Sequence, residues 1–204
     1  MVSKSESLVA GLPVSDQGLG VRRSTISYTR FQLFVAACDV GELIVSVGGW
    51  MCDRIRAGWD VTVAVSEQRD LRALQILGVT PFVADQGFES AVDDVGTAAI
   101  AIAPEIVESN ENIRSKVVRA LDDGVAEVTL WGATIPPGLR GRVDRLQHRL
   151  SGAAHAFKAH ALAAAGIPAT AVSATEDLYC AAPWYDGYCE PDTHRLASGQ
   201  RQDR

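Results

Sequence analysis

The sequence predicts a single α/β domain, a three-layer sandwich of the Rossmann or flavodoxin type with a mostly parallel sheet of about six strands. Three observations lead to this fold class. Short apolar runs alternate with amphipathic segments, most of those segments are long enough to be helices, and the apolar runs are continuous rather than interrupted by polar residues. Helical crossovers join parallel strands, and strands that helices cover on both faces are apolar throughout.

Composition divides the 204 residues into three parts. Residues 1–28 are polar and lack periodicity, so we expect a flexible N-terminal arm. Residues 29–179 carry the α/β pattern, and residues 180–204 form an aromatic and then polar C-terminal tail. In this tail Trp184, Tyr185 and Tyr188 need an apolar surface, which is either their own domain or a second copy of the chain. The second alternative would make the protein a homo-oligomer.

The first strand is expected at residues 31–37, and the helix after it begins at Asp39. Asp39 and Glu42 have the spacing of a capping box. Apolar residues then recur every four positions, and Gly58 marks the end of the helix.

Two successive glycines, Gly48 and Gly49, lie inside this helix. A glycine there costs about 1 kcal/mol relative to alanine. The pair therefore indicates close packing of the helix on a neighbouring strand, or a kink.

The later segments repeat the pattern. Further strands are expected at residues 60–65, 79–84, 98–103, 125–131 and 169–174. Helices are expected from a Ser66 cap to Gly78, near residues 88–96, at 109–123 and from about 143 to 165. Residues 132–142 are rich in glycine and proline and are expected to form a loop.

Four polar residues would share one face of the last helix: Arg145, His148, His155 and Lys158. The two histidines are seven positions apart, which is about 10 Å along a helix and too far for one metal ion. We expect this face to be solvated.

Composition and charge exclude several classes of protein. The formal net charge is -6, whereas binding to phosphates needs a basic face, so no nucleic-acid partner is expected. No apolar segment reaches the roughly 18 residues that span a bilayer, and no signal-peptide pattern opens the chain, so we expect a cytoplasmic protein without a membrane partner. The cysteines lack C-x-x-C spacing and are expected to be unpaired thiols. They are Cys38, Cys52, Cys180 and Cys189.

Ligands of open parallel sheets bind beyond the carboxyl ends of the strands, at a switch in strand order. The residues expected there form an acidic rim, and the loop at 132–142 adds arginines that either hold a phosphate or carboxylate or balance nearby acids. The candidate ligand-binding residues are Asp39, Glu42, Ser66, Asp85, Glu105, Thr134, Arg140 and Arg142. Cys38 is either a buried residue that closes a strand or a thiol activated by the helix N-terminus.

Two interpretations of Asp39 and Glu42 stay open. They cap the helix, or they bind a divalent cation, or a cationic or hydroxylated ligand, together with Asp85 and Glu105. A pyrophosphate is disfavoured because carboxylates already occupy the helix N-terminus. Neither G-x-G-x-x-G nor G-x-x-x-x-G-K-[ST] is present. Ordinary NAD and ATP binding are therefore not expected, and the cofactor is unknown.

The stretch "FVAACDVGELIVSVGGWMCDRIRAGWDVTVAV" covers residues 34–65. It resembles the opening β-α-β unit of the zinc-dependent N-acetylglucosaminyl deacetylase family in its acid-bearing turn, its Gly-Gly helix and its second strand. That family carries His-Pro-Asp-Asp after the first strand, where this chain has Cys38-Asp39-Val40-Gly41. The first zinc-binding histidine is missing, so the resemblance implies no catalytic role for these residues.

The absence of strong motifs within a clear fold favours a non-catalytic module that senses a small-molecule ligand or binds a protein partner. The alternative is a small metal-assisted hydrolase or transferase. Such an enzyme would use the acidic rim, with Cys38 or the arginines of the 132–142 loop.

Overall fold

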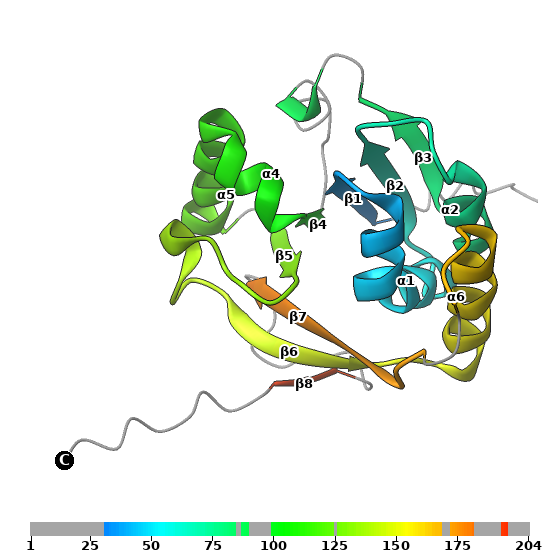
Figure 1. Ribbon diagram of the computed structural model, residues 1–204. Helices are drawn as coiled ribbons and strands as arrows, with labels where there is room; N and C mark the ends of the chain where they lie inside the picture. The colour runs from blue at the N-terminus through cyan, green and yellow to red at the C-terminus, as the bar shows by residue number, and fades with distance from the viewer. Residues whose placement is uncertain are drawn as a thin grey trace, which may run out of the picture.

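The computed structural model of the chain describes residues 31–84, 87–89, 99–124, 126–168, 172–181 and 193–195 (Figure 1). The strands are β1 (Gln32–Ala37), β2 (Asp60–Val65), β3 (Thr80–Val83), β4 (Ala99–Ile102), β5 (Glu127–Trp131), β6 (Asp144–Arg149), β7 (Thr175–Ala181) and β8 (Thr193–Arg195). The helices are α1 (Val40–Arg56), α2 (Leu71–Leu77), α4 (Pro104–Ser109), α5 (Glu111–Asp123) and α6 (Gly152–Ala164), with a 3-10 helix at Pro137–Leu139.

These strands form one eight-stranded sheet in the order β3-β2-β1-β4-β5-β7-β6-β8. Strands β1 to β5 pair in parallel, whereas β7, β6 and β8 add antiparallel pairs at one side. The predicted α/β class with a mostly parallel sheet is confirmed. The chain runs outward from β1 to β3 and then returns to β4 on the other side of β1. Strand order therefore reverses between β1 and β4, and a crevice is expected at the carboxyl ends of these two strands.

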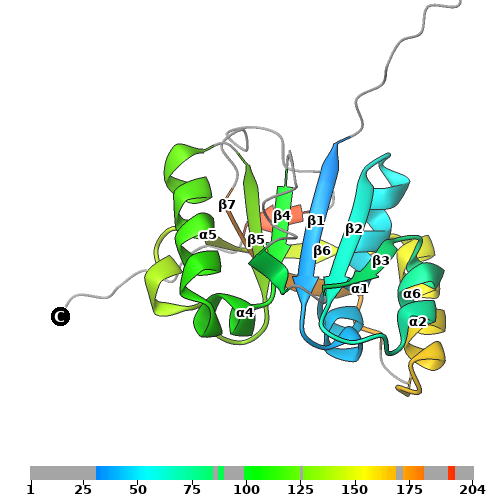
Figure 2. The same cartoon turned by 90° about the horizontal axis from the view of Figure 1, so that it is seen from above.

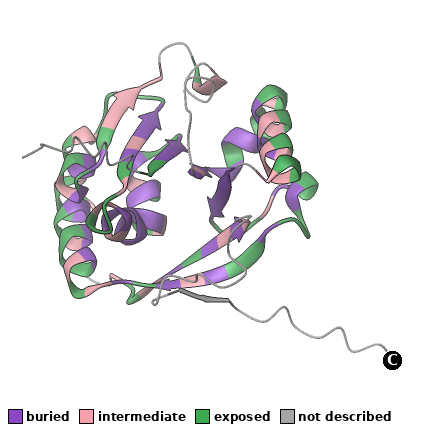
Figure 3. Ribbon diagram, turned by 180° about the vertical axis from the view of Figure 1, so that it is seen from behind, coloured by how far each residue is buried: buried purple, intermediate pink, exposed green. Residues whose placement is uncertain are grey.

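Helices cover both faces of the sheet. Right-handed crossovers place α1 and α2 on one face, and they place α4 and α5 on the other because β4 to β5 runs in the opposite direction. Figure 2 shows these two groups on opposite sides of the strands, with α6 packed beside α1 and α2. The central strands β1, β2, β4 and β5 are mostly buried between the layers (Figure 3), and in β1 only Gln32 is exposed, whereas β3 at the edge is only partly buried.

The long helix predicted from 143 to 165 is wrong in its first part. Residues 144–149 are strand β6, which pairs with β7 and β8, and helix α6 begins only at Gly152. Leu146, His148 and Leu150 are buried at alternate positions, as a strand requires. The four-residue spacing of Leu146 and Leu150 also fits a helix, and only the pairing with β7 distinguishes the two.

Two of the four residues expected on a solvated face of the last helix are buried. His148 and Lys158 are each 2% exposed. His148 Nε2 lies 3.0 Å from Asp53 Oδ2, and Lys158 Nζ lies 2.5 Å from Glu176 Oε1. Long polar side chains can be buried when a partner of opposite charge or a hydrogen-bonding partner meets them, and the linear sequence does not show these partners.

The last predicted strand, at 169–174, is also misplaced. The observed strand is β7, residues 175–181, and residues 169–171 lie outside the described part of the chain. β7 runs past the expected domain boundary at 179, and β8 lies within the expected tail. The N-terminal arm, the aromatic cluster of the tail and Cys189 fall outside the described residues.

Two helix starts differ from the predictions. Helix α2 begins at Leu71 rather than after a Ser66 cap, with Asp70 in left-handed backbone geometry at the N-cap position. Pro104 does not merely end β4, because it opens the short helix α4. The short helix expected near 88–96 lies almost wholly outside the described residues. Among the described residues, no helix is long and apolar enough to cross a membrane.

The close-packing interpretation of the two glycines is confirmed for Gly49. A Cβ atom at Gly49 would lie 2.2 Å from Leu150 Cδ2. Only a residue without a Cβ lets α1 approach the end of β6 this closely.

Candidate active site

An acidic rim lies at the crevice between β1 and β4. Cys38 and Asp39 directly follow β1, and Glu105 lies in the first turn of α4, directly after β4. β1 and β4 are hydrogen-bonded neighbours, so their carboxyl ends bring these residues to one place. All three are exposed. Asp85, the fourth acid expected here, lies outside the described residues.

Asp39 and Glu42 make different contacts. Asp39 is the N-cap of α1, and its Oδ1 accepts a hydrogen bond of 2.6 Å from the backbone N–H of Glu42. The carboxylate of Glu42 accepts hydrogen bonds from Trp131 Nε1 at 3.0 Å and from Ser46 Oγ at 2.7 Å. Glu42 is therefore directed toward the end of β5 instead of the reciprocal position of a capping box.

The carboxylates of the rim influence the Cys38 thiol electrostatically. Burial raises the pKa of the Cys38 thiol, and the carboxylates of Glu105, Glu42 and Asp39 raise it further. All three therefore act on the same sulfur atom. A thiol with a raised pKa is protonated at neutral pH and is a poor nucleophile. The acids thus outweigh the helix N-terminus that could have activated Cys38.

Of the remaining candidates, Ser66 contacts the rim, and the others lie in the loop after β5. Ser66 supports the rim, since its Oγ donates a hydrogen bond of 2.8 Å to the Cys38 carbonyl. Arg142 forms an ion pair with Asp122 in the last turn of α5, shortly before the start of β5. Thr134 and Arg140 are exposed in the loop after β5. Arg142 is thus engaged with α5 and not with the rim.

A pocket of about 470 Å³ adjoins the rim. Its walls come from α1, the loop after β5, and strands β6 and β7. It is lined by Val45, Ser46, Gly132, Ala133, Arg145, Thr175, Glu176, Asp177 and Tyr179. Ser46 belongs to both regions, because it lines the pocket and donates its hydroxyl hydrogen bond to Glu42.

The charges that line this pocket are balanced. Arg145 Nη2 lies 2.8 Å from Asp177 Oδ2, and Glu176 is paired with Lys158 beneath the surface. Hydroxyl groups of Ser46, Thr175 and Tyr179 complete the lining. Such a surface suits a polar ligand without net charge.

Sequence reasoning missed most of the pocket. Arg145 was considered only as an arginine near the loop after the fifth strand or on a solvated helix face, and Ser46 and Tyr179 were given no role in a site. Arg145 and Tyr179 face each other across β6 and β7. No local signal shows that these two residues meet, because their proximity depends on the pairing of β6 with β7. The local pattern of the first segment predicts a helix, and that of the second predicts a loop.

The described residues contain no group of three or more His, Cys, Asp or Glu side chains that could hold a metal ion. Two histidines have other partners: His148 contacts Asp53, and His155 contacts the Val172 carbonyl. Asp39 and Glu42 already accept hydrogen bonds. The described residues do not fit a resident zinc ion, and no step proposed below depends on one.

Comparison with known proteins identifies relatives of the fold. No protein-family model matches the chain, and no curated protein sequence does. The solved deacetylase–teicoplanin complex of teicoplanin biosynthesis aligns with a TM-score of 0.52 at 10% identity, over 82% of this chain and 100% of that one. The A40926 pseudoaglycone deacetylase aligns with a TM-score of 0.51 at 11% identity, over 82% and 98%. The zinc-inhibited form of teicoplanin deacetylase aligns with a TM-score of 0.51 at 10% identity, over 81% and 98%.

These similarities establish the fold, and they correct the functional expectation. The structures that share it are of deacetylases, which are hydrolytic enzymes. The expectation of a non-catalytic sensing or interaction module is therefore contradicted.

The effect of the nearby carboxylates on the pKa of Cys38 can be tested by alkylation. Glu105→Gln removes the carboxylate that acts most strongly on the thiol. The pKa of Cys38 should then fall, more thiolate should form, and the reaction with iodoacetamide at pH 8 should become faster. The rate is measured by mass spectrometry of the peptide that contains Cys38. Glu108→Gln makes the same change elsewhere on α4 and should leave the rate unchanged. Equal rates in the two variants would mean that Glu105 does not act on Cys38.

Proposed function

We propose that the protein is a hydrolase that removes an acyl group from a small polar molecule at the acidic rim. The observation that carries this proposal is the placement of Asp39, Glu42 and Glu105 after β1 and β4 at the strand-order switch, next to a pocket of ligand size whose wall residue Ser46 contacts Glu42. Two similarities support it: the fold of solved deacetylases, and the resemblance of residues 34–65 to a deacetylase family.

Glu105 is the proposed general base. Asp39 caps α1, and Glu42 accepts two hydrogen bonds, whereas no hydrogen bond or ion pair engages the Glu105 side chain among the described residues. An exposed carboxylate at this position can take a proton from a water molecule as the water adds to the acyl carbonyl. The carbonyl–nitrogen or carbonyl–oxygen bond then breaks, and the leaving group takes the proton back from Glu105. The products are a carboxylic acid and a free amine or alcohol.

The adjoining pocket would hold the body of the substrate. Its balanced charges and its three hydroxyl groups favour a hydroxylated molecule without net charge. The raised pKa of Cys38 argues against a covalent thioester route, because that route needs a thiolate. Direct attack by water is therefore the proposed reaction.

The test is a hydrolysis screen with purified protein. The panel contains N-acetylated amino sugars and teicoplanin, the molecule held in the complex of one structurally similar deacetylase, and mass spectrometry measures the released acid. Glu105→Gln should lower kcat by roughly 10²–10⁴-fold with little change in KM, since this is the usual contribution of a general base. Glu108→Gln is the matched control and should retain the wild-type rate. Release of acid at equal rates by wild type and Glu105→Gln, or no release from any substrate, would contradict the proposal.

A further inference from the structure

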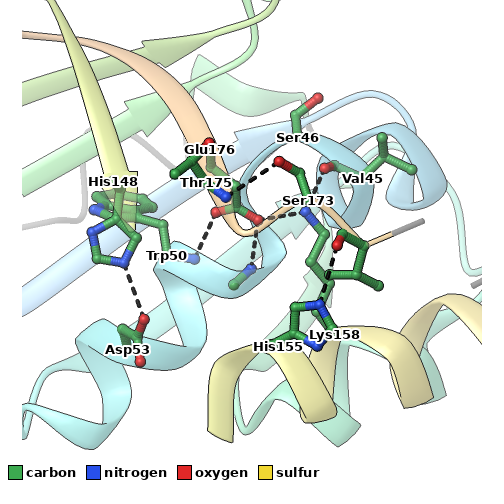
Figure 4. Close-up of polar contacts among 12 residues, drawn as sticks. Val45, Ser46, Trp50, Asp53, His148, His155, Lys158, Ser173, Thr175 and Glu176 are labelled. Atoms are coloured by element: carbon green, nitrogen blue, oxygen red, sulfur yellow. Dashed lines mark hydrogen bonds and ion pairs between the residues drawn. The ribbon is translucent and has the colours of Figure 1, made fainter. Parts of the chain in front are cut away.

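A buried ion pair lies directly under the wall of the pocket. Lys158 of α6 and Glu176 of β7 have side chains that are 3% and 2% exposed, and Lys158 Nζ lies 2.5 Å from Glu176 Oε1. Both ions also bind the backbone of α1 (Figure 4). Lys158 Nζ donates to the Val45 carbonyl at 2.6 Å. Glu176 accepts from the backbone N–H groups of Gly49 at 2.9 Å and Trp50 at 2.7 Å.

These contacts reach backbone groups that the helix also uses for its own hydrogen bonds. In an α-helix the N–H of residue 49 pairs with the carbonyl of residue 45. Here the Val45 carbonyl accepts from Lys158, and the Gly49 N–H donates to Glu176. Both members of one helical hydrogen bond thus have a partner outside the helix.

The segment of α1 held in this way reaches the rim through hydrogen bonds. Val45 and Ser46 form the α1 wall of the pocket. Ser46 Oγ donates to Glu42 Oε1, and Glu42 Oε2 accepts from Trp131 Nε1. One connected path therefore leads from the buried ion pair to the Glu42 carboxylate and to the end of β5.

Stability alone does not account for such a pair. Taking two ions out of water costs free energy that their attraction often fails to recover, and well-packed apolar replacements are frequently as stable or more stable. A role other than stability therefore has to lie in the α1 segment that the pair contacts.

We propose that Lys158 and Glu176 are positioning residues, which hold the 45–50 segment of α1 so that Ser46 sets the Glu42 carboxylate against Trp131. The proposal deepens the proposed function, on which its consequence for turnover rests. Its structural part is measurable without any substrate.

The test replaces both ions with an apolar pair, Lys158→Met with Glu176→Met. The readout is the indole N–H signal of Trp131 in an NMR spectrum, where the four tryptophans give four such signals and Trp131→Phe assigns the right one. Loss of the charged acceptor should shift this signal and speed its exchange with solvent by about tenfold or more. The melting temperature should stay equal to that of wild type or rise. Removing the exposed pair Arg142 and Asp122 in the same way should leave the indole signal unchanged.

A second variant tests the same path without changing the buried charges. Ser46→Ala removes the link between α1 and Glu42, and it should move the Trp131 signal in the same direction. An unchanged signal in either variant would overturn the proposal. So would an unfolded double variant, because the pair would then be required for stability.

Turnover distinguishes this proposal from the proposed function. If hydrolysis is found, the double variant should lower kcat at an unchanged melting temperature. If hydrolysis is found and the indole signal does not move, the positioning role alone fails. If no substrate is hydrolysed and the signal moves as expected, the proposed function alone fails.

Discussion

Replacing Lys158 alone with methionine is expected to lower the free energy of unfolding by roughly 3–5 kcal/mol, the usual cost of leaving a buried charge without its partner. Glu176 is 3% exposed, and Lys158 supplies the only cation that contacts it among the described residues. The two α1 amides that also bind this carboxylate cannot replace a full positive charge. Denaturant unfolding measures the loss. Arg149→Met, an exposed change on β6, should alter stability by no more than about 0.5 kcal/mol.

The loss should depend on pH in a defined direction. Burial raises the pKa of Glu176, and Lys158 is the first of the groups that oppose this rise. Without Lys158 the folded-state pKa rises further above the unfolded-state value. A carboxyl group of this kind favours the folded state when it is protonated, and that contribution is lost as the pH rises. Lys158→Met should therefore approach wild-type stability as the pH falls from 7 toward about 5. A loss that is independent of pH would contradict the assignment to an uncompensated carboxylate.

The second large effect is expected at the other end of α1. Arg54 Nη2 lies 2.8 Å from Glu127 Oε1, with side chains that are 4% and 2% exposed. The guanidinium carbon also lies 5.2 Å from the ring centroid of Trp50 and 4.4 Å from that of Trp59. Arg54→Met removes the cation next to the buried Glu127 and both aromatic contacts, so we expect a loss of roughly 3–5 kcal/mol.

Two further variants separate charge from shape at this position. Arg54→Lys keeps the positive charge but loses the planar guanidinium, and it should lose less stability than Arg54→Met. Arg56→Met changes an exposed residue at the end of α1 and should change stability by no more than about 0.5 kcal/mol. Denaturant unfolding again measures all three. Equal losses for Arg54→Lys and Arg54→Met would show that aromatic packing, and not the charge beside Glu127, is what matters.

Both ion pairs contact α1, one through the Arg54 side chain and the other through the α1 backbone. Each joins α1 to a different strand, Glu127 on β5 and Glu176 on β7. His148 and Asp53 form a third polar contact, between β6 and α1. α1 also carries Asp39 and Glu42 at its start. The buried polar contacts of this helix are thus connected to the geometry of the candidate site.

The sequence alone determined the alternation of strands and helices through β5. The strands β1, β2, β4 and β5 are mostly buried, and α1, α2 and α5 each bury one apolar face, so local patterns and the tertiary structure agree there. Asp39 could be identified as an N-cap for the same reason, because a cap bonds within three residues of its own position.

The tertiary structure decided the rest, because it depends on partners distant in sequence. Residues 144–149 fit a helix by spacing and become a strand because β7 pairs with them. Strand order places Glu105 beside Cys38, although 66 other residues separate them in the chain. The local pattern around His148 and Lys158 predicts a solvated face, whereas Asp53 and Glu176 meet them in the interior. Burial of a charged side chain is a property of a pair, and a linear sequence shows only one member at a time.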